Sequence, residues 1–168
     1  MSRLWIYFAV MFFVQLLLFL AHAFYEKKLS EVPRILWLGV LSGIVPGLLC
    51  DVIFGKYLGL ASYALGFGPL FLILNAVFGY GLFAANTLLM QQARLLHFCV
   101  WTTIVVAVYE ILNLFLPSWT YPFAVPSVEY VIIAFGAPLG LAIVIATSWH
   151  VLFGYRFIFI DNITKRHS

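Results

Sequence analysis

Five long apolar runs dominate the sequence, at residues 4–24, 35–54, 64–90, 98–117 and 128–155. A helix rises about 1.5 Å per residue, so about 20 residues cross the roughly 30 Å hydrocarbon core of a bilayer. Backbone groups without a hydrogen bond in hydrocarbon cost several kcal/mol each, and the runs show no alternating strand pattern, so helices are the expected form. We therefore predict an all-α, polytopic membrane helix bundle with five transmembrane helices, forming a single transmembrane domain over residues 1–168.

Composition excludes the soluble and disordered classes of protein. The chain is 65% hydrophobic and 9% charged, whereas a soluble domain is about 45–50% apolar and about 25% charged. The formal charge of +3 comes from cations spread over loops and the tail. Because no basic stripe lies beside aromatic residues, we expect no nucleic-acid partner.

The cations predict the orientation of the helices. If the odd helices run from outside to inside, the outer segments carry only Arg3 and Lys56. The inner segments then carry seven cations: Lys27, Lys28, Arg34, Arg94, Arg156, Lys165 and Arg166. Positive charges concentrate on the cytoplasmic side of membrane proteins. We therefore expect a protein of the cell membrane with its N-terminus outside and its C-terminus in the cytoplasm.

The first apolar run also resembles a secretory signal peptide. Arg3 precedes it, and Ala21-His22-Ala23 provides a small-residue cleavage site. Cleavage there would invert the charge distribution, and the run is long for a signal. We expect a retained first helix.

A short string occurs twice and suggests an internal repeat. Phe67-Gly68-Pro69-Leu70 opens the third run, and Phe135-Gly136-Ala137-Pro138 follows early in the fifth. The chain is then one helix followed by two hairpins of the same sense, a possible parallel repeat. This interpretation predicts that Pro69 and Pro138 bend their helices at similar depth.

Three acids gather in the outer half of the predicted bundle. Asp51 and Glu110 lie inside apolar runs, and Glu129 opens the fifth. Together they suggest a site that binds a cation or a proton, with Asn113 one helical turn from Glu110 on the same face. Alternatively, Asp51 extends to the interface and pairs with Lys56, and Glu129 is a solvated helix start. We expect Glu110 to face the bundle interior, stabilised by Asn113 or by a polar group of the second or third helix.

Other polar and small residues have a structural interpretation. Asn75 and Asn86 are expected to hydrogen-bond across helices, and Gly79-Tyr80-Gly81 to allow close helix approach.

The uncharged loop over residues 118–127 contains three aromatic residues and two prolines. It either lies on the membrane surface or folds inward over the outer end of the bundle.

No motif of known catalytic or cofactor chemistry is present. The chain lacks HExxH, GxSxG and P-loop patterns, so we assign no catalytic residue and no cofactor. His22, His97 and His150 lie at similar predicted depth, but none of the spacings that mark a metal site within one element occurs. We therefore expect interfacial histidines and no metal.

A pattern of single residues resembles an uncharacterised family of small five-helix membrane proteins of spore-forming Firmicutes. Its residues here are Asp51, Lys56-Tyr57 and Tyr63, then Tyr80-Gly81-Leu82 and Asn86, then Tyr109-Glu110. The chain departs from that family after Glu110, where a proline-interrupted loop replaces a Trp- and Tyr-rich run. The resemblance implies that Asp51 and Glu110 belong to one site.

Two main functions remain open at this point. The first is a non-enzymatic binding or accessory component that acts through helix–helix contacts in the bilayer, as a homo-oligomer or with a partner membrane protein. The second is a small cation- or proton-coupled transporter or channel that uses Asp51 and Glu110, and an intramembrane enzyme is a third. A polar face continuous across the bilayer would favour transport. A closed bundle with a flat outer face rich in Gly or aromatic residues would favour the accessory role.

Overall fold

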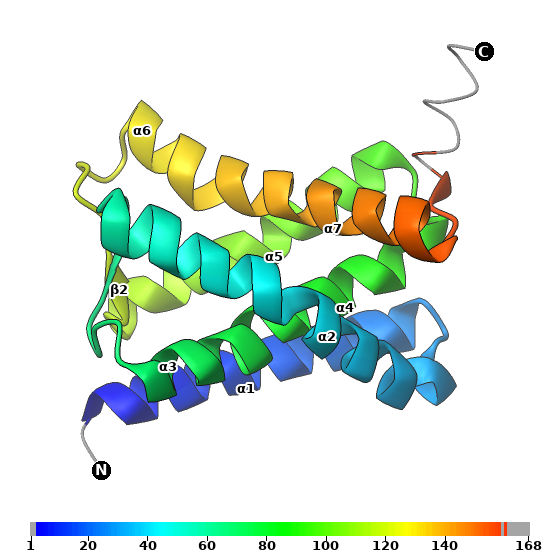
Figure 1. Ribbon diagram of the computed structural model, residues 1–168, viewed down its shortest axis with the longest axis horizontal. Coiled ribbons are helices and arrows are strands. Elements are labelled where there is room, and N and C mark those ends of the chain that lie inside the picture. Colours follow the sequence, from blue (N-terminus) through cyan, green and yellow to red (C-terminus); the bar gives the residue numbers. More distant parts are fainter. Residues whose placement is uncertain (1–2, 159, 161–168) are drawn as a thin grey trace.

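The computed structural model describes residues 3–158 and 160 and is a bundle of helices (Figure 1). In this part of the chain, five helices are long and apolar enough to cross a membrane: Arg3–Tyr25, Leu29–Tyr57, Pro69–Leu89, Leu95–Phe115 and Val128–Phe153. This agrees with the predicted all-α bundle of five apolar helices.

Several of the five spans are built from more than one helical segment. The first span is α1 (Arg3–Tyr25), and the fourth is α5 (Leu95–Phe115). The second joins a 3₁₀ turn η1 (Leu29–Glu31), α2 (Val32–Cys50) and a π-helical segment η2 (Asp51–Tyr57). The third joins α3 (Pro69–Leu74), a π segment η3 (Asn75–Tyr80) and α4 (Gly81–Leu89), with a 3₁₀ turn η4 (Met90–Gln92) after it. The fifth joins α6 (Val128–Val131), a π segment η5 (Ile132–Gly136) and α7 (Ala137–Phe153).

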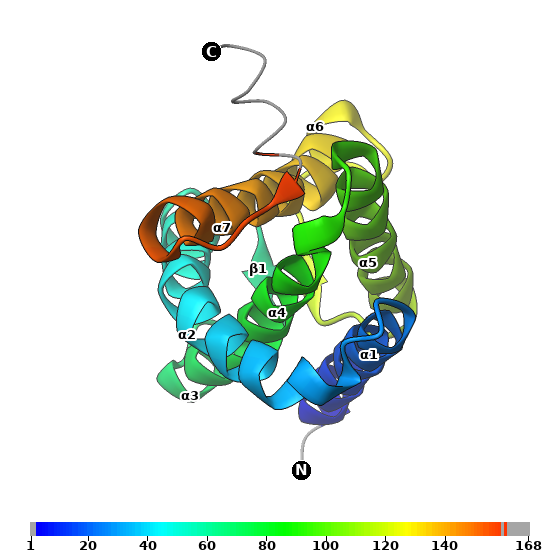
Figure 2. The ribbon, with the colours of Figure 1, turned by 90° about the vertical axis from the view of Figure 1, so that its right-hand side faces the viewer.

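The third span is the central helix of the bundle. Seen along the bundle, α4 lies between α1, α2, α5 and α7 (Figure 2). Its sequence is rich in small residues, and Ala84 and Ala85 are fully buried. Small side chains let several helix backbones approach one another closely, which a chain needs when no water drives helix association.

Glycines of α2 make the closest helix contact. A Cβ added at Gly43 would lie 2.5 Å from the carbonyl oxygen of Tyr80, and one at Gly39 would lie 2.6 Å from that of Gly81. One at Gly47 would meet the Tyr80 ring at 2.5 Å. The predicted close approach at Gly79-Tyr80-Gly81 is therefore confirmed, and its partner is the glycine row of α2.

Two short strands depart from the purely helical prediction. β1 (Ser62–Tyr63) pairs antiparallel with β2 (Trp119–Thr120), in the register Ser62 to Thr120 and Tyr63 to Trp119. The strands join the loop after the second span to the loop after the fourth at one end of the bundle. We call residues 58–68 and 116–127 the end cap. Of the two interpretations of the aromatic loop, its first half follows the inward one, because Ser118 is fully buried.

The two prolines of the suspected repeat do not occupy equivalent positions. Pro69 is the first residue of α3 and follows Gly68, whose backbone is extended. Pro138 lies ten residues after Val128, behind the π segment of the fifth span. The expectation that Pro69 bends a helix is wrong, because a proline at the first helical position removes no backbone hydrogen bond. The third span accordingly begins five residues later than predicted.

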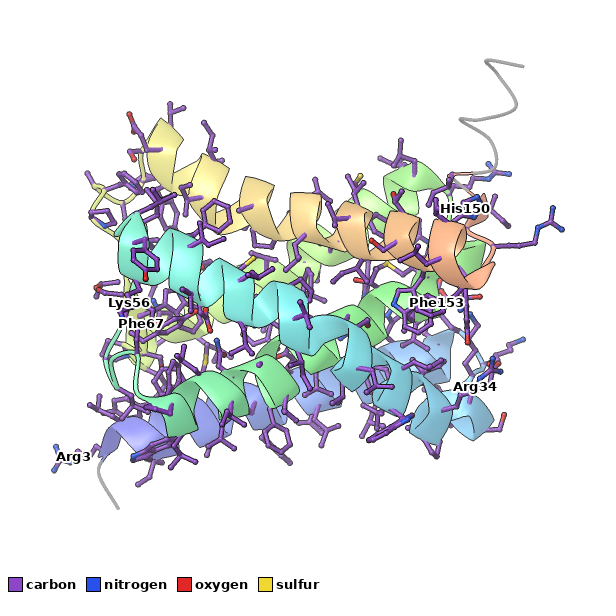
Figure 3. All side chains as sticks on the ribbon, in the orientation of Figure 1. Arg3, Arg34, Lys56, Phe67, His150 and Phe153 are labelled. Atoms are coloured by element: carbon purple, nitrogen blue, oxygen red, sulfur yellow. The ribbon has the colours of Figure 1, made fainter. Side chains whose placement is uncertain are left out.

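The cations used for the orientation separate by end. Arg3 and Lys56 lie at one end of the bundle and Arg34 lies at the other (Figure 3). Lys165 and Arg166, also counted for the inner side, lie outside the described residues.

Candidate functional site

Asp51 is a buried carboxylate surrounded by neutral hydrogen-bond donors. It is 2% exposed. The hydroxyls of Tyr63 and Tyr80 donate to Oδ1 at 2.8 and 3.0 Å, and the Asn75 amide donates to Oδ2 at 2.8 Å. We call these four residues the Asp51 cluster. Asp51 therefore does not pair with Lys56, and Asn75 makes its expected bond across helices.

Two π segments position this cluster. Asp51 begins η2, Asn75 begins η3 and Tyr80 ends η3. A π segment places one extra residue in a turn and so changes the direction of the side chains around it, and such segments are frequent at functional sites. Here the altered turns of two neighbouring spans bring their polar side chains together.

Aromatic rings enclose the cluster on the side of the end cap. The centroid of the Tyr63 ring lies 4.9 Å from that of the Phe71 ring and 5.6 Å from that of the Phe67 ring. Phe8 of α1 packs against Phe71, with the ring centroids 4.6 Å apart. These rings shield the hydrogen bonds of Asp51 from solvent and lipid and thereby strengthen them.

Glu110 forms a second cluster with tyrosines. It is 8% exposed, on α5. The Tyr121 hydroxyl donates to Oε1 at 2.8 Å, and the Tyr130 hydroxyl donates to Oε2 at 3.0 Å. The expected interior position of Glu110 is confirmed by its burial. The prediction of its donors is wrong, because the observed donors belong to the end cap and to the fifth span.

Asn113 instead holds the loop that follows its own helix. Its Nδ2 donates to the Trp119 carbonyl at 2.8 Å. Its Oδ1 accepts the backbone N–H groups of Ser118 and Trp119 at 2.9 and 3.1 Å. Asn113 lies in the last turn of α5, which ends at Phe115, so these bonds fasten the loop to the helix end.

The two carboxylates share no hydrogen-bond donor, although the same end cap covers both. Tyr63 of β1 binds Asp51, while Tyr121, directly after β2, binds Glu110. Because β1 and β2 pair with each other, the two clusters are joined through the cap. Glu129, the remaining acid of the predicted site, is exposed in the first turn of α6, where Ser127 caps the helix.

The phenols that reach the acids from the cap remain protonated at neutral pH. Burial, and then the nearby Asp51, raises the pKa of Tyr63 well above its ordinary value. Burial, and then Glu110, raises the pKa of Tyr121 in the same way. Among the described residues, no Lys, Arg or His nitrogen lies within 4.0 Å of either carboxylate. Each acid is therefore held by neutral donors.

A row of polar groups between α1 and the third span is interrupted in the half of the bundle away from the end cap. Gln15 donates to the Gly79 carbonyl at 2.7 Å, and His22 contacts Asn86 at 3.2 Å. Phe19 and Leu82 lie between these pairs in sequence and are buried in the hydrophobic core. Polar contacts among the described residues thus do not continue from one end of this row to the other.

The interface between α4 and α5 is closed in the same region. A small gap lined by Asn86, Thr102 and Trp101, among others, has no space for a water molecule. Together with the apolar interruption beside α1, this gives a packed interior in the half of the bundle away from the end cap.

The sequence contained signals for the residues that were missed. A buried acid in a membrane needs donors, and Tyr121 and Tyr130 follow Glu110 within 20 residues. The spacing of Gly39, Gly43 and Gly47 was a visible small-residue row. Of the four tyrosine donors, the pattern of the family resemblance includes Tyr63 and Tyr80.

The five long apolar helices of the described residues are compatible with a membrane protein. A comparison with protein families, with curated proteins and with solved structures finds no match in any of the three.

Proposed function

We propose that this chain is a non-enzymatic, multi-pass accessory component of the membrane that associates with other transmembrane helices. Its contact surface is the lipid-facing side of the fifth span, around Gly136 and Gly140. A second copy of the chain is the partner that this surface fits.

The contrast between two glycine rows carries the proposal. A Cβ added to Gly39, Gly43 or Gly47 would clash at 2.5–2.6 Å. One added to Gly140 would meet nothing within 4 Å, and one added to Gly136 only Ile132 of its own span, at 4.0 Å. The first row is used for packing within the chain. The second has the same Gly-x-x-x-Gly spacing and is open.

The surroundings of Gly136 and Gly140 suit a flat contact between equal surfaces. Ile132, Ile143 and Val144 are exposed beside them, and residues 130–155 contain no charged residue. A two-fold pair brings the same patch of both copies together, so an uncharged row of small residues is complementary to itself.

The packed interior and the hydrogen-bonded acids support the same proposal. Neither carboxylate is open to the middle of the bundle, and the polar row beside α1 is interrupted. These features suit Asp51 and Glu110 as anchors of the end cap. The exposed apolar helix faces then remain as the main contact area.

Cysteine cross-linking in native membranes tests the proposal. In a Cys50→Ala, Cys99→Ala background, Gly140→Cys should form a disulfide-linked dimer on mild oxidation. Leu41→Cys, exposed in the middle of α2, is the matched control and should remain monomeric. Adding Gly136→Leu to Gly140→Cys should reduce the dimer at least fivefold, because the larger side chain separates the two helices.

Equal cross-linking of Gly140→Cys and Leu41→Cys would contradict the proposal. So would a dimer that Gly136→Leu leaves unchanged. Circular dichroism and elution as a single species in detergent show that the variants are folded.

A cation- or proton-coupled transporter is the second candidate. The absence of a cationic partner within 4.0 Å of Asp51 or Glu110, among the described residues, favours it. In proteoliposomes, this function requires an ion flux that Asp51→Asn and Glu110→Gln abolish without unfolding the chain. The accessory role predicts no flux in the unaltered protein.

The suggested kinship with the Firmicutes family remains a proposal. It is supported by Asp51, Tyr63 and Tyr80, three residues of the quoted pattern that form one hydrogen-bonded cluster. Members of that family can be aligned with this chain. If they have no hydrogen-bonding residue at the position of Asn75, the proposed kinship is contradicted.

A further inference from the structure

We propose a binding site for a divalent transition-metal ion, of the zinc class, formed by His22, Glu26 and His97. The site lies at the end of the bundle opposite the end cap, where α1 ends and α5 begins. It is independent of the proposed association through the fifth span.

The three side chains come together from two helical regions. His22 and Glu26 are one turn apart at the end of α1, and His97 is the third residue of α5. One potential ligand atom from each residue lies within 4.8 Å of the other two. The His22 Nε2 and the Glu26 Oε1 are 3.8 Å apart. No metal-ligand spacing is visible in the sequence because the third ligand is 71 residues away from the second.

His22 supplies the observation that points to a ligand. It is fully buried, and its Nε2 has no hydrogen-bond partner. A buried polar atom without a partner destabilises the folded state, so such an atom requires an explanation. The Glu26 Oε1, at 3.8 Å, lies beyond hydrogen-bond distance.

The environment of His22 fixes which nitrogen is free. Asn86 donates its Nδ2 to the Leu82 carbonyl at 3.3 Å, which leaves its Oδ1 facing the His22 Nδ1 at 3.2 Å. The Nδ1 therefore carries the proton, and the Nε2 presents its lone pair toward Glu26 and His97. A metal-bound histidine is typically held in this way, with its second nitrogen donating to an oxygen of the protein.

The donor set selects the class of ion. Two imidazoles and one carboxylate suit Zn²⁺ and neighbouring transition metals, whereas Mg²⁺ and Ca²⁺ prefer oxygen alone. Zinc bonds of about 2.0–2.2 Å place tetrahedral ligands roughly 3.3–3.5 Å apart. Glu26 and His97 are both partly exposed, so small side-chain movements close the set, with water as the fourth ligand.

The neighbouring groups limit the site without blocking it. The Trp101 ring packs against His22 with the ring centroids 4.4 Å apart and closes one side. Lys28 is a nearby cation, but its Nζ donates to the Leu89 carbonyl at 2.9 Å. Glu26 therefore remains available to balance part of the charge of the ion.

Titration of the full-length, metal-free protein in detergent with Co²⁺ tests the site. Every protein used carries His167→Ala, which removes a further potential metal ligand that lies outside the described residues. One Co²⁺ per chain should bind and produce the visible absorption typical of tetrahedral coordination, and Zn²⁺ should displace it. His97→Ala and Glu26→Gln should each weaken binding at least tenfold.

The matched control is His150→Ala, at the same end of the bundle (Figure 3), which should bind as the parent protein does. His97 and Glu26 are chosen because they are partly exposed, so the fold should persist, as circular dichroism can verify. Absence of the tetrahedral spectrum in the parent protein would overturn the proposal. Unchanged affinity in both His97→Ala and Glu26→Gln, or equal loss in His150→Ala, would overturn it as well.

Discussion

Tyrosine hydroxyls stabilise the carboxylates of Asp51 and Glu110, a role that cations have in many buried ion pairs. Four tyrosines reach the two acids at 2.8–3.0 Å. A phenol carries little desolvation cost compared with an ammonium group, and its ring adds apolar contact in the same place. Neutral donors therefore allow an acid to be buried in an apolar bundle without a second buried charge.

Removing one of these donors should destabilise the fold measurably. We predict that Tyr63→Phe lowers the free energy of unfolding by about 1–2 kcal/mol, because the buried Asp51 loses one of its hydrogen bonds. Thermal unfolding in detergent measures the change.

Tyr57→Phe is the control for this substitution, because Tyr57 is 77% exposed at the end of the same π segment. A Tyr63→Phe variant as stable as Tyr57→Phe would show that the Asp51 cluster contributes nothing to stability.

At the level of elements, identical glycine spacing has opposite consequences in α2 and in the fifth span. Gly43 lies directly against the backbone of Tyr80, whereas Gly140 lies against nothing. A Gly-x-x-x-Gly row marks a helix face that a neighbour can approach closely. It does not say whether that neighbour belongs to the same chain.

We predict that Gly43→Ala destabilises the bundle by about 1–3 kcal/mol, since the added methyl group must push α2 away from the third span. Gly140→Ala should leave stability unchanged or raise it by up to about 1 kcal/mol, because alanine favours a helix and meets open space. Thermal unfolding at a protein concentration giving one chain per micelle compares the two. Equal stability of both variants would refute the close packing of α2 on the third span.

For the whole molecule, the distribution of cations predicts which end faces the cytoplasm. Arg3 and Lys56 lie at one end with the end cap, and Arg34 lies at the other. The bundle separates the two groups of cations among the described residues. The charge distribution then favours the Arg34 end as cytoplasmic.

An impermeant thiol reagent in intact cells tests this orientation. In the Cys50→Ala, Cys99→Ala background, Ser62→Cys of the end cap should be labelled, and Ser30→Cys and Ser168→Cys should be labelled only after the cells are opened. Ser62 and Ser30 are both exposed, so access differs only by side. Labelling of Ser168→Cys in intact cells would reverse the orientation.

The sequence by itself determined the number of apolar helices and their approximate limits, because hydrophobicity is a local property that sums along each run. It also predicted that Glu110 is buried with hydrogen-bonding partners and that Asn75 and Asn86 bond across helices. Only the tertiary structure decided which partners these are. Asn75 meets Asp51 from 24 residues away, and Asn86 meets His22 from 64 residues away. Such pairs depend on how helices are rotated and on where π segments shift a turn, and neither follows from the hydrophobicity of a single run.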